Sequence, residues 1–121
     1  RMYKDMSKII VLSYFKRQLK PLVKKHRDLK DAVINTLHTF HPDHHDHLGD
    51  DVYKVRLSAK SLHRGKSNAF RLILLVVDVD DLLVPVTIYF KGDRETVSQK
   101  EMNDHLQHIL FELDHHRGKI T

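Results

Sequence analysis

The sequence predicts an α+β fold in which a helical hairpin packs on a small, largely antiparallel sheet. A short strand pattern and two amphipathic helix patterns open the chain, three strand patterns occupy its middle, and one more helix pattern ends it. The 121 residues are enough to bury one core, and they contain no repeat, linker or domain boundary. We therefore predict one domain over residues 1–121, with the element order β-α-α-β-β-β-α.

The first third of the chain predicts one strand and two helices. Residues 8–13 form a short β-branched run that suits a strand. A strongly basic amphipathic helix follows, and Pro21 is expected to kink or split it. Its apolar stripe is Phe15, Leu19, Leu22, Val23 and His26. Asp28 is the expected N-cap of the second helix. The buried stripe of that helix is Leu29, Val33, Leu37 and Phe40.

The middle of the chain changes from a polar loop to strands. Residues 41–51 carry histidines, aspartates, Pro42 and Gly49 without apolar periodicity, and so predict a loop. From Tyr53 to Leu57 apolar residues alternate with Lys54 and Arg56, which predicts a strand with one apolar and one basic face.

A hairpin and a helix are predicted next. The apolar residues 70–77 predict a buried strand, 78–81 a turn, and 83–91 the hairpin partner, with Pro85 near its start. Ser98 and Glu101 form a capping box, which predicts the start of the last helix. The apolar stripe of this helix is Met102, Leu106, Ile109, Leu110 and Leu113.

The charge balance favours a polyanionic partner. Lys and Arg total 21 against 16 Asp and Glu, which gives a net charge of +5 and a pI near 9.5. The absence of cysteine excludes disulfides, thiolate metal sites and cysteine nucleophiles, and is compatible with a reducing cytosol. The longest apolar run, 72–77, is too short to span a membrane. We expect a soluble cytoplasmic protein.

Three motifs that suggest a specific chemistry have weak support. Gly65-Lys66-Ser67 resembles the end of a P-loop, but position 60 is lysine and a strand follows instead of a helix. Four histidines and two aspartates in residues 41–47 offer metal ligands, yet a loop supplies no defined geometry, so a solvated, weakly metal-trapping loop is favoured over a physiological site. Asp78, Asp80 and Asp81 are better explained by a turn than by paired catalytic carboxylates.

Basic residues on the strands and in the loop between them form the leading candidate site. They are Lys54, Arg56, Lys60, Arg64, Lys66, Arg71 and Lys91. A guanidinium in an apolar strand is costly to bury. Arg71 therefore either pairs with a carboxylate such as Asp93 or Glu95, or faces a solvent-filled concavity that binds an anion. Convergence of these cations on one sheet face predicts binding of a phosphodiester backbone.

The chain resembles the RelE/ParE superfamily of bacterial toxins from type II toxin-antitoxin systems, in its RelE and HigB-like branch. The resemblance covers about residues 7–113 and rests on the order of five segments: FKRQLKPLVKKH, VYKVRL, RGKSNAFRLI, VTIYFK and SQKEMNDHL. It implies a RelE-like fold, an antitoxin partner, and ribosome-dependent cleavage of mRNA without a cofactor or metal. It also implies catalytic roles for Lys54, Arg56, Arg71 and Lys91. We expect the loop cations Lys60, Arg64 and Lys66 to bind RNA.

Two departures from the family pattern affect the expected site. Asn68 and Ala69 stand where related sequences often have two glycines, and the last helix lacks the tyrosine that some RelE-like toxins use. His63, His105 and His108 are candidates for the general acid by charge type, although each is more readily explained as a surface histidine. The alternative functions are a ParE-type toxin acting on DNA gyrase and a non-catalytic, basic nucleic-acid-binding domain.

Overall fold

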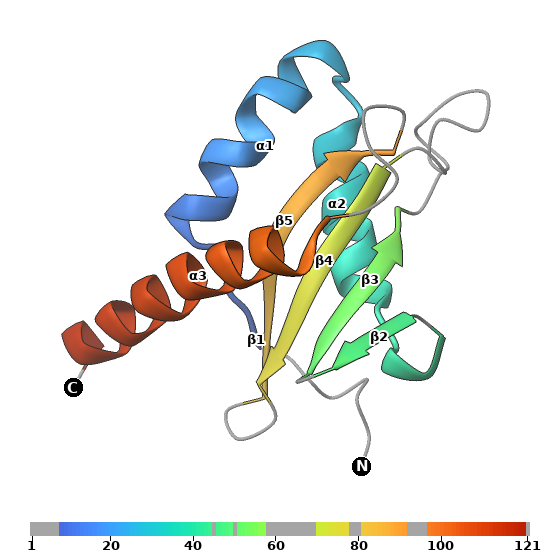
Figure 1. Cartoon of the computed structure of the whole chain (residues 1–121). Helices are drawn as coiled ribbons and strands as arrows, with labels where there is room; N and C mark the ends of the chain where they lie inside the picture. Colours follow the sequence, from blue (N-terminus) through green and yellow to red (C-terminus); the bar gives the residue numbers. More distant parts are fainter. Residues whose placement is uncertain are drawn as a thin grey trace.

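A computed structural model describes residues 8–44, 46–49, 51–57, 70–77, 81–91 and 97–120. In chain order the elements are β1 (Lys8–Ile9), α1 (Ser13–Lys25), α2 (Leu29–Thr39), a 3-10 turn (Pro42–His44), β2 (Asp46–Gly49), β3 (Val52–Arg56), β4 (Phe70–Val77), β5 (Leu82–Phe90) and α3 (Gln99–Ile120). The predicted α+β fold is confirmed (Figure 1). None of the helices in the described part of the chain is long and apolar enough to cross a membrane.

The strands form one sheet in the order β1-β5-β4-β3-β2. Neighbouring strands from β5 to β2 are antiparallel, and β1 alone runs parallel to its neighbour β5. Phe70 pairs with Phe90 at one end of the central hairpin, and Val77 pairs with Leu82 at the other. The predicted largely antiparallel sheet is therefore confirmed.

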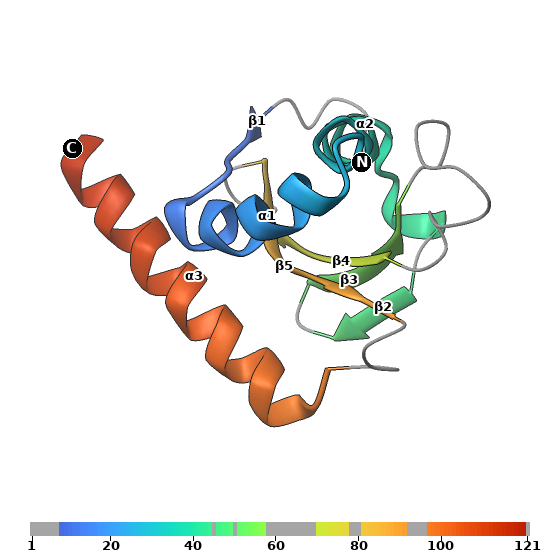
Figure 2. The ribbon, with the colours of Figure 1, turned by 90° about the horizontal axis from the view of Figure 1, so that it is seen from above.

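Helices cover the two faces of the sheet unequally. Side chains from α1 and α2 pack against alternate residues of β3 and β4, and the largest of them, Phe15 and Leu29, are fully buried together with Leu72 and Leu74. α3 crosses the opposite face, where Ile109 packs in one cluster with the β4 and β5 side chains. Figure 2 shows α1 and α2 on one side of the sheet and α3 on the other.

The predicted first strand is too long, and the predicted loop before β3 is partly wrong. In the described part of the chain β1 comprises Lys8 and Ile9. The Ile10 N–H still donates a hydrogen bond to the Leu83 carbonyl oxygen, and Ser13 already belongs to α1. Within 41–51, residues 46–49 form an edge strand along β3. An edge strand pairs through its backbone and needs no apolar face, so a run of His and Asp gives no strand pattern.

The sequence signals for helix ends and breaks are followed to different degrees. Ser98 Oγ accepts a hydrogen bond from the Glu101 N–H at 3.1 Å, and Glu101 Oε1 accepts one from the Ser98 N–H at 3.3 Å, which confirms the capping box. Asp28 occupies the N-cap of α2, but its side chain makes no capping hydrogen bond. α1 runs as one helix through Pro21.

The apolar stripe predicted for α3 is correct except at one position. Met102, Ile109 and Leu113 are buried, whereas Leu110 is 46% exposed. The sheet contacts only a narrow stripe of the helix, because a helix lying on a sheet presents few side chains per turn to it. Leu110 and its neighbour Phe111 therefore lie outside the contact.

Candidate nucleic-acid interface

Cross-strand pairing gathers three of the predicted basic residues on the face of the sheet that α3 crosses. Side chains alternate along a strand, so Lys54 and Arg56 share one face of β3. Lys54 pairs with Ile73 of β4, and Arg56 pairs with Arg71. Because Ile73 packs in the cluster with α3, all three basic residues belong to that face. Lys54 is partly buried and Arg56 is exposed.

Arg71 is more enclosed than an open concavity would allow. Its side chain is 6% exposed, and Nη1 donates a hydrogen bond to the carbonyl oxygen of Phe70 at 3.3 Å. This burial does not fit the alternative in which Arg71 faces a solvent-filled concavity. The alternative partners, Asp93 and Glu95, lie outside the described residues. The buried Arg71 lies between two cross-strand partners, the exposed Arg56 on β3 and Tyr89 on β5.

Tyr89 is a residue of this face that the sequence analysis missed. It pairs directly with Arg71 across the β4–β5 ladder and is 8% exposed. Symmetric counting outward from the predicted 78–81 turn places Ile88 opposite Arg71. A register shift between Ile73 and Leu74 brings Tyr89 there instead, and no sequence pattern marks that shift. Tyr89 gives this face a tyrosine, the residue type that is missing from the last helix.

The other predicted site residues are not brought into this group. Lys91 is exposed and lies one residue beyond the end of β5. Lys60, Arg64 and Lys66, and with them His63, lie outside the described residues.

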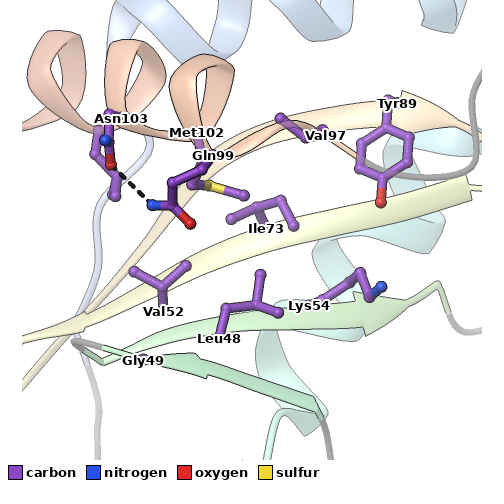
Figure 3. Close-up of a pocket in the computed structure, with 11 residues that line it drawn as sticks. Leu48, Gly49, Val52, Lys54, Ile73, Tyr89, Val97, Gln99, Met102 and Asn103 are labelled. Atoms are coloured by element: carbon purple, nitrogen blue, oxygen red, sulfur yellow. Dashed lines mark hydrogen bonds between the residues drawn. The ribbon is translucent and has the colours of Figure 1, made fainter.

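A pocket adjoins the basic residues where the first turns of α3 cross the sheet. It has a volume of about 160 Å³. Its walls are Leu48, Gly49, Val52, Lys54, Ile73, Tyr89, Val97, Gln99, Met102, Asn103 and Leu106. Figure 3 shows Lys54 and Tyr89 at one end and Gln99 with Asn103 at the other. The pocket thus has an apolar floor with polar groups at both ends.

The two candidate histidines of α3 pack against α1. The hydroxyl of Tyr14 lies 2.6 Å from Nδ1 of His105, and the ring of Tyr14 stacks on that of His108 at a centroid separation of 4.6 Å. Burial raises the pKa of the Tyr14 hydroxyl, and the nearby Asp104 carboxylate raises it further. Neither histidine lines the pocket, so their contacts indicate a structural role between the helices.

α3 also caps the N-terminus of α1. Glu112 accepts hydrogen bonds from the backbone N–H groups of Ser13 at 2.7 Å and Tyr14 at 2.9 Å. Burial by itself raises the pKa of the Glu112 carboxyl, but these hydrogen bonds outweigh that effect and the pKa lies below its ordinary value. The N-cap residue of α1, Leu12, has no side chain that can cap, so Glu112 supplies this interaction from a distant part of the chain.

The histidine-rich segment contributes to the sheet edge. The His47 ring stacks on Tyr53 with centroids 4.7 Å apart, and His41 Nδ1 lies 3.8 Å from an Asp43 carboxylate oxygen. Among the described residues no group of three or more His, Cys, Asp or Glu side chains is placed to hold a metal ion.

The chain is similar to the RelE toxin of E. coli. The isolated RelE structure is 14% identical over 84% of this chain and 97% of that chain, with a TM-score of 0.49. The toxin-antitoxin complex RelBE of E. coli contains a chain that is 16% identical, over 67% of this chain and 92% of that chain, with a TM-score of 0.45. No protein-family model matches the chain, and neither does any curated protein. The likeness to RelE concerns the fold and says nothing about a reaction.

Proposed function

We propose that this chain is a toxin of the RelE/ParE superfamily that cleaves mRNA on the ribosome and is neutralised by an antitoxin. One observation carries the proposal: Lys54, Arg56 and Arg71 share one sheet face, and Lys54 lines a pocket there. Three cations on adjacent strands put more positive charge on one face than an isolated surface lysine would, and a phosphodiester backbone binds to such a face electrostatically. The segment order in the sequence, which resembles this superfamily, adds independent support. The toxin domain would span residues 1–121 and act in the cytoplasm.

The chemistry that these residues support is attack of a ribose 2′-hydroxyl on the adjacent phosphorus. The attacking oxygen forms a bond to phosphorus while its proton is removed. The bond to the 5′-oxygen of the next nucleotide then breaks, and that oxygen takes up a proton, leaving a 2′,3′-cyclic phosphate. Negative charge grows on the phosphorane oxygens, and fixed cations lower the energy of that transition state. Lys54 and Arg56 would contact the phosphorane oxygens from the solvent side, and the buried Arg71 would add positive charge from within the sheet.

The proposed antitoxin has a suitable docking surface on the opposite side of the molecule. A groove of about 540 Å³ lies between α1 and α2. Its floor is apolar, formed by Val11, Leu19, Val23, Val33, Ile34 and Leu37, and its rim carries Lys16, Lys20, Lys24 and Lys30. An amphipathic helix with acidic flanks complements a groove of this kind. We propose that the antitoxin places such a helix there.

The test of the proposed reaction compares growth and mRNA cleavage after induction of three versions of the chain. The wild type should arrest growth and produce ribosome-positioned cuts in a reporter mRNA, detected by primer extension. A Lys54→Ala, Arg56→Ala variant should lose the cuts. The matched control, Lys25→Ala with Arg27→Ala, also removes one lysine and one arginine, both exposed and both near the connection between α1 and α2. It should cut like the wild type.

The other outcomes separate the alternatives. Growth arrest without cleavage, equal in all three versions, would overturn the nuclease proposal and favour an effect on DNA gyrase. Salt-sensitive RNA binding without arrest or cleavage would indicate a non-catalytic nucleic-acid-binding domain, since electrostatic backbone contacts weaken as salt rises.

A further inference from the structure

The pocket between α3 and the sheet has the size and the lining of a site for one flat ring. Its volume is about 160 Å³, and an apolar cavity of about 150 Å³ is known to hold one benzene molecule. Ile73 and Met102 form the floor and are almost completely buried. Leu48 lies at the rim and is 46% exposed. A ring inserted between these side chains would remove apolar surface from water on both of its faces.

The polar end of the pocket presents a hydrogen-bond acceptor on an exposed side chain. Gln99 Nε2 donates a hydrogen bond to Asn103 Oδ1 at 3.1 Å, which leaves the Gln99 amide oxygen to accept from a ligand. Figure 3 shows this hydrogen bond, with the oxygen of the Gln99 amide directed toward the sheet. The capping box at Ser98 holds the start of the helix, and therefore Gln99, in place. The ligand that fits this end carries an N–H donor on its ring.

The opposite end of the pocket favours an anion. Lys54 lines it, and Arg56 and Arg71 continue the positive charge along the same face. Tyr89 lies beside Lys54 and has its hydroxyl at the same end (Figure 3). A ring with an N–H group at one end and a phosphate attached through a sugar at the other is the chemistry of a nucleotide.

We propose that this pocket takes one pyrimidine base of the RNA that the basic face binds. The N–H donor of the base, N4 of cytosine or N3 of uracil, bonds to Oε1 of Gln99, and the neighbouring phosphate lies against Lys54. The single ring of a pyrimidine matches a pocket of about 160 Å³ more closely than the two fused rings of a purine do. This inference rests on the proposed function and adds a base preference to it, with Asn103 as the residue that positions Gln99.

The test titrates the isotope-labelled full chain with three probes and follows its NMR spectrum. Cytidine 5′-monophosphate should shift the methyl signals of Ile73 and Met102 and the side-chain amide of Gln99. Adenosine 5′-monophosphate should shift the two methyl groups less than cytidine 5′-monophosphate does, and ribose 5-phosphate should affect Lys54 and Arg56 but leave both methyl groups unchanged. Gln99→Ala should weaken cytidine monophosphate binding about fivefold, the loss expected for one hydrogen bond. Asn103→Ala should weaken it less. The matched control Gln107→Ala changes an exposed glutamine of the same helix, and it should bind like the wild type.

Two results would overturn the inference. They are equal shifts of Ile73 and Met102 by adenosine monophosphate, and shifts confined to Lys54 and Arg56 at saturating cytidine monophosphate. None of these readouts depends on cleavage. A chain that binds cytidine monophosphate in the pocket but leaves mRNA intact would therefore refute the proposed reaction while keeping the pocket.

Discussion

The two faces of the sheet differ in how they are covered. Under α1 and α2, large side chains such as Phe15, Leu72 and Leu74 are completely buried, and the packing continues along the strands. On the other face, α3 covers Ile73, but Arg56 on the same face is exposed. Because strand side chains alternate, neighbouring residues of β4 serve different faces. One strand thereby provides the core on one side and the candidate site on the other.

The largest effect on stability should come from replacing a large buried side chain on the sheet face that α1 and α2 cover. Phe15 is fully buried in that core, and Phe15→Ala should lower the free energy of unfolding by about 3–5 kcal/mol. Urea unfolding followed by circular dichroism measures this change. Phe111→Ala is the matched control, because Phe111 is 77% exposed, and it should change stability by less than about 0.5 kcal/mol. Similar losses in the two variants would contradict the assignment of the core to this face.

Arg71 tests the point at which core and candidate site meet. Its stem is buried and its guanidinium donates to the Phe70 carbonyl oxygen. Arg71→Ala removes packing as well as charge. It should lower the free energy of unfolding by about 1–3 kcal/mol, and it should also abolish mRNA cleavage. Lys54→Ala with Arg56→Ala should abolish cleavage while changing the unfolding free energy by less than about 1 kcal/mol. If both variants kept full stability, Arg71 would not belong to the buried layer.

Local patterns predicted the elements whose own residues carry the structural signal. Lys54 and Arg56 alternate with apolar residues, and β3 forms there with the expected basic face. The strand predicted over 70–77 has the bounds that the structure shows, and the capping box begins α3 as expected. In each case the signal lies within a few neighbouring residues.

Features that depend on distant contacts escaped the sequence analysis. β2 pairs through its backbone, so its side chains carry no alternation. Tyr89 joins the basic face because of the β4–β5 register, and Gln99 joins the pocket because α3 crosses the sheet at that point. The carboxylate that accepts hydrogen bonds at the N-terminus of α1 belongs to Glu112, which lies 99 residues further along the chain than Ser13. No pattern near either residue indicates their contact.

Glu112 provides a pH-dependent test of the way α3 is held beside α1. Since its pKa is lowered in the folded chain, the stabilisation is present above the ordinary value of 4.5 and is lost as the pH falls through the lower, folded-state pKa. Glu112→Gln should therefore cost about 1 kcal/mol near neutral pH and progressively less in acid. Thermal unfolding between pH 7 and pH 3 measures the difference. Asp114→Asn, an exposed carboxylate on the same helix, serves as the control and should show no such convergence with the wild type.

The smallest expected effect concerns the first turn of α3, which lies beside the pocket on the sheet face that carries Arg56. Ser98→Ala removes the hydrogen bond to the Glu101 N–H and should cost about 0.5–1 kcal/mol. Thr39→Ala is the control, because Thr39 is exposed and bonds only to the preceding helical turn, at the Asn35 carbonyl.

Amide hydrogen exchange locates the loss caused by Ser98→Ala. Faster exchange confined to residues 99–103, together with weaker cytidine monophosphate binding, would show that the cap holds Gln99 in place. Faster exchange across β4 and β5 as well would mean that this turn supports the whole sheet. The face that carries Arg56 would then depend on α3 for its stability, just as the other face depends on α1 and α2. The two faces would differ in charge alone.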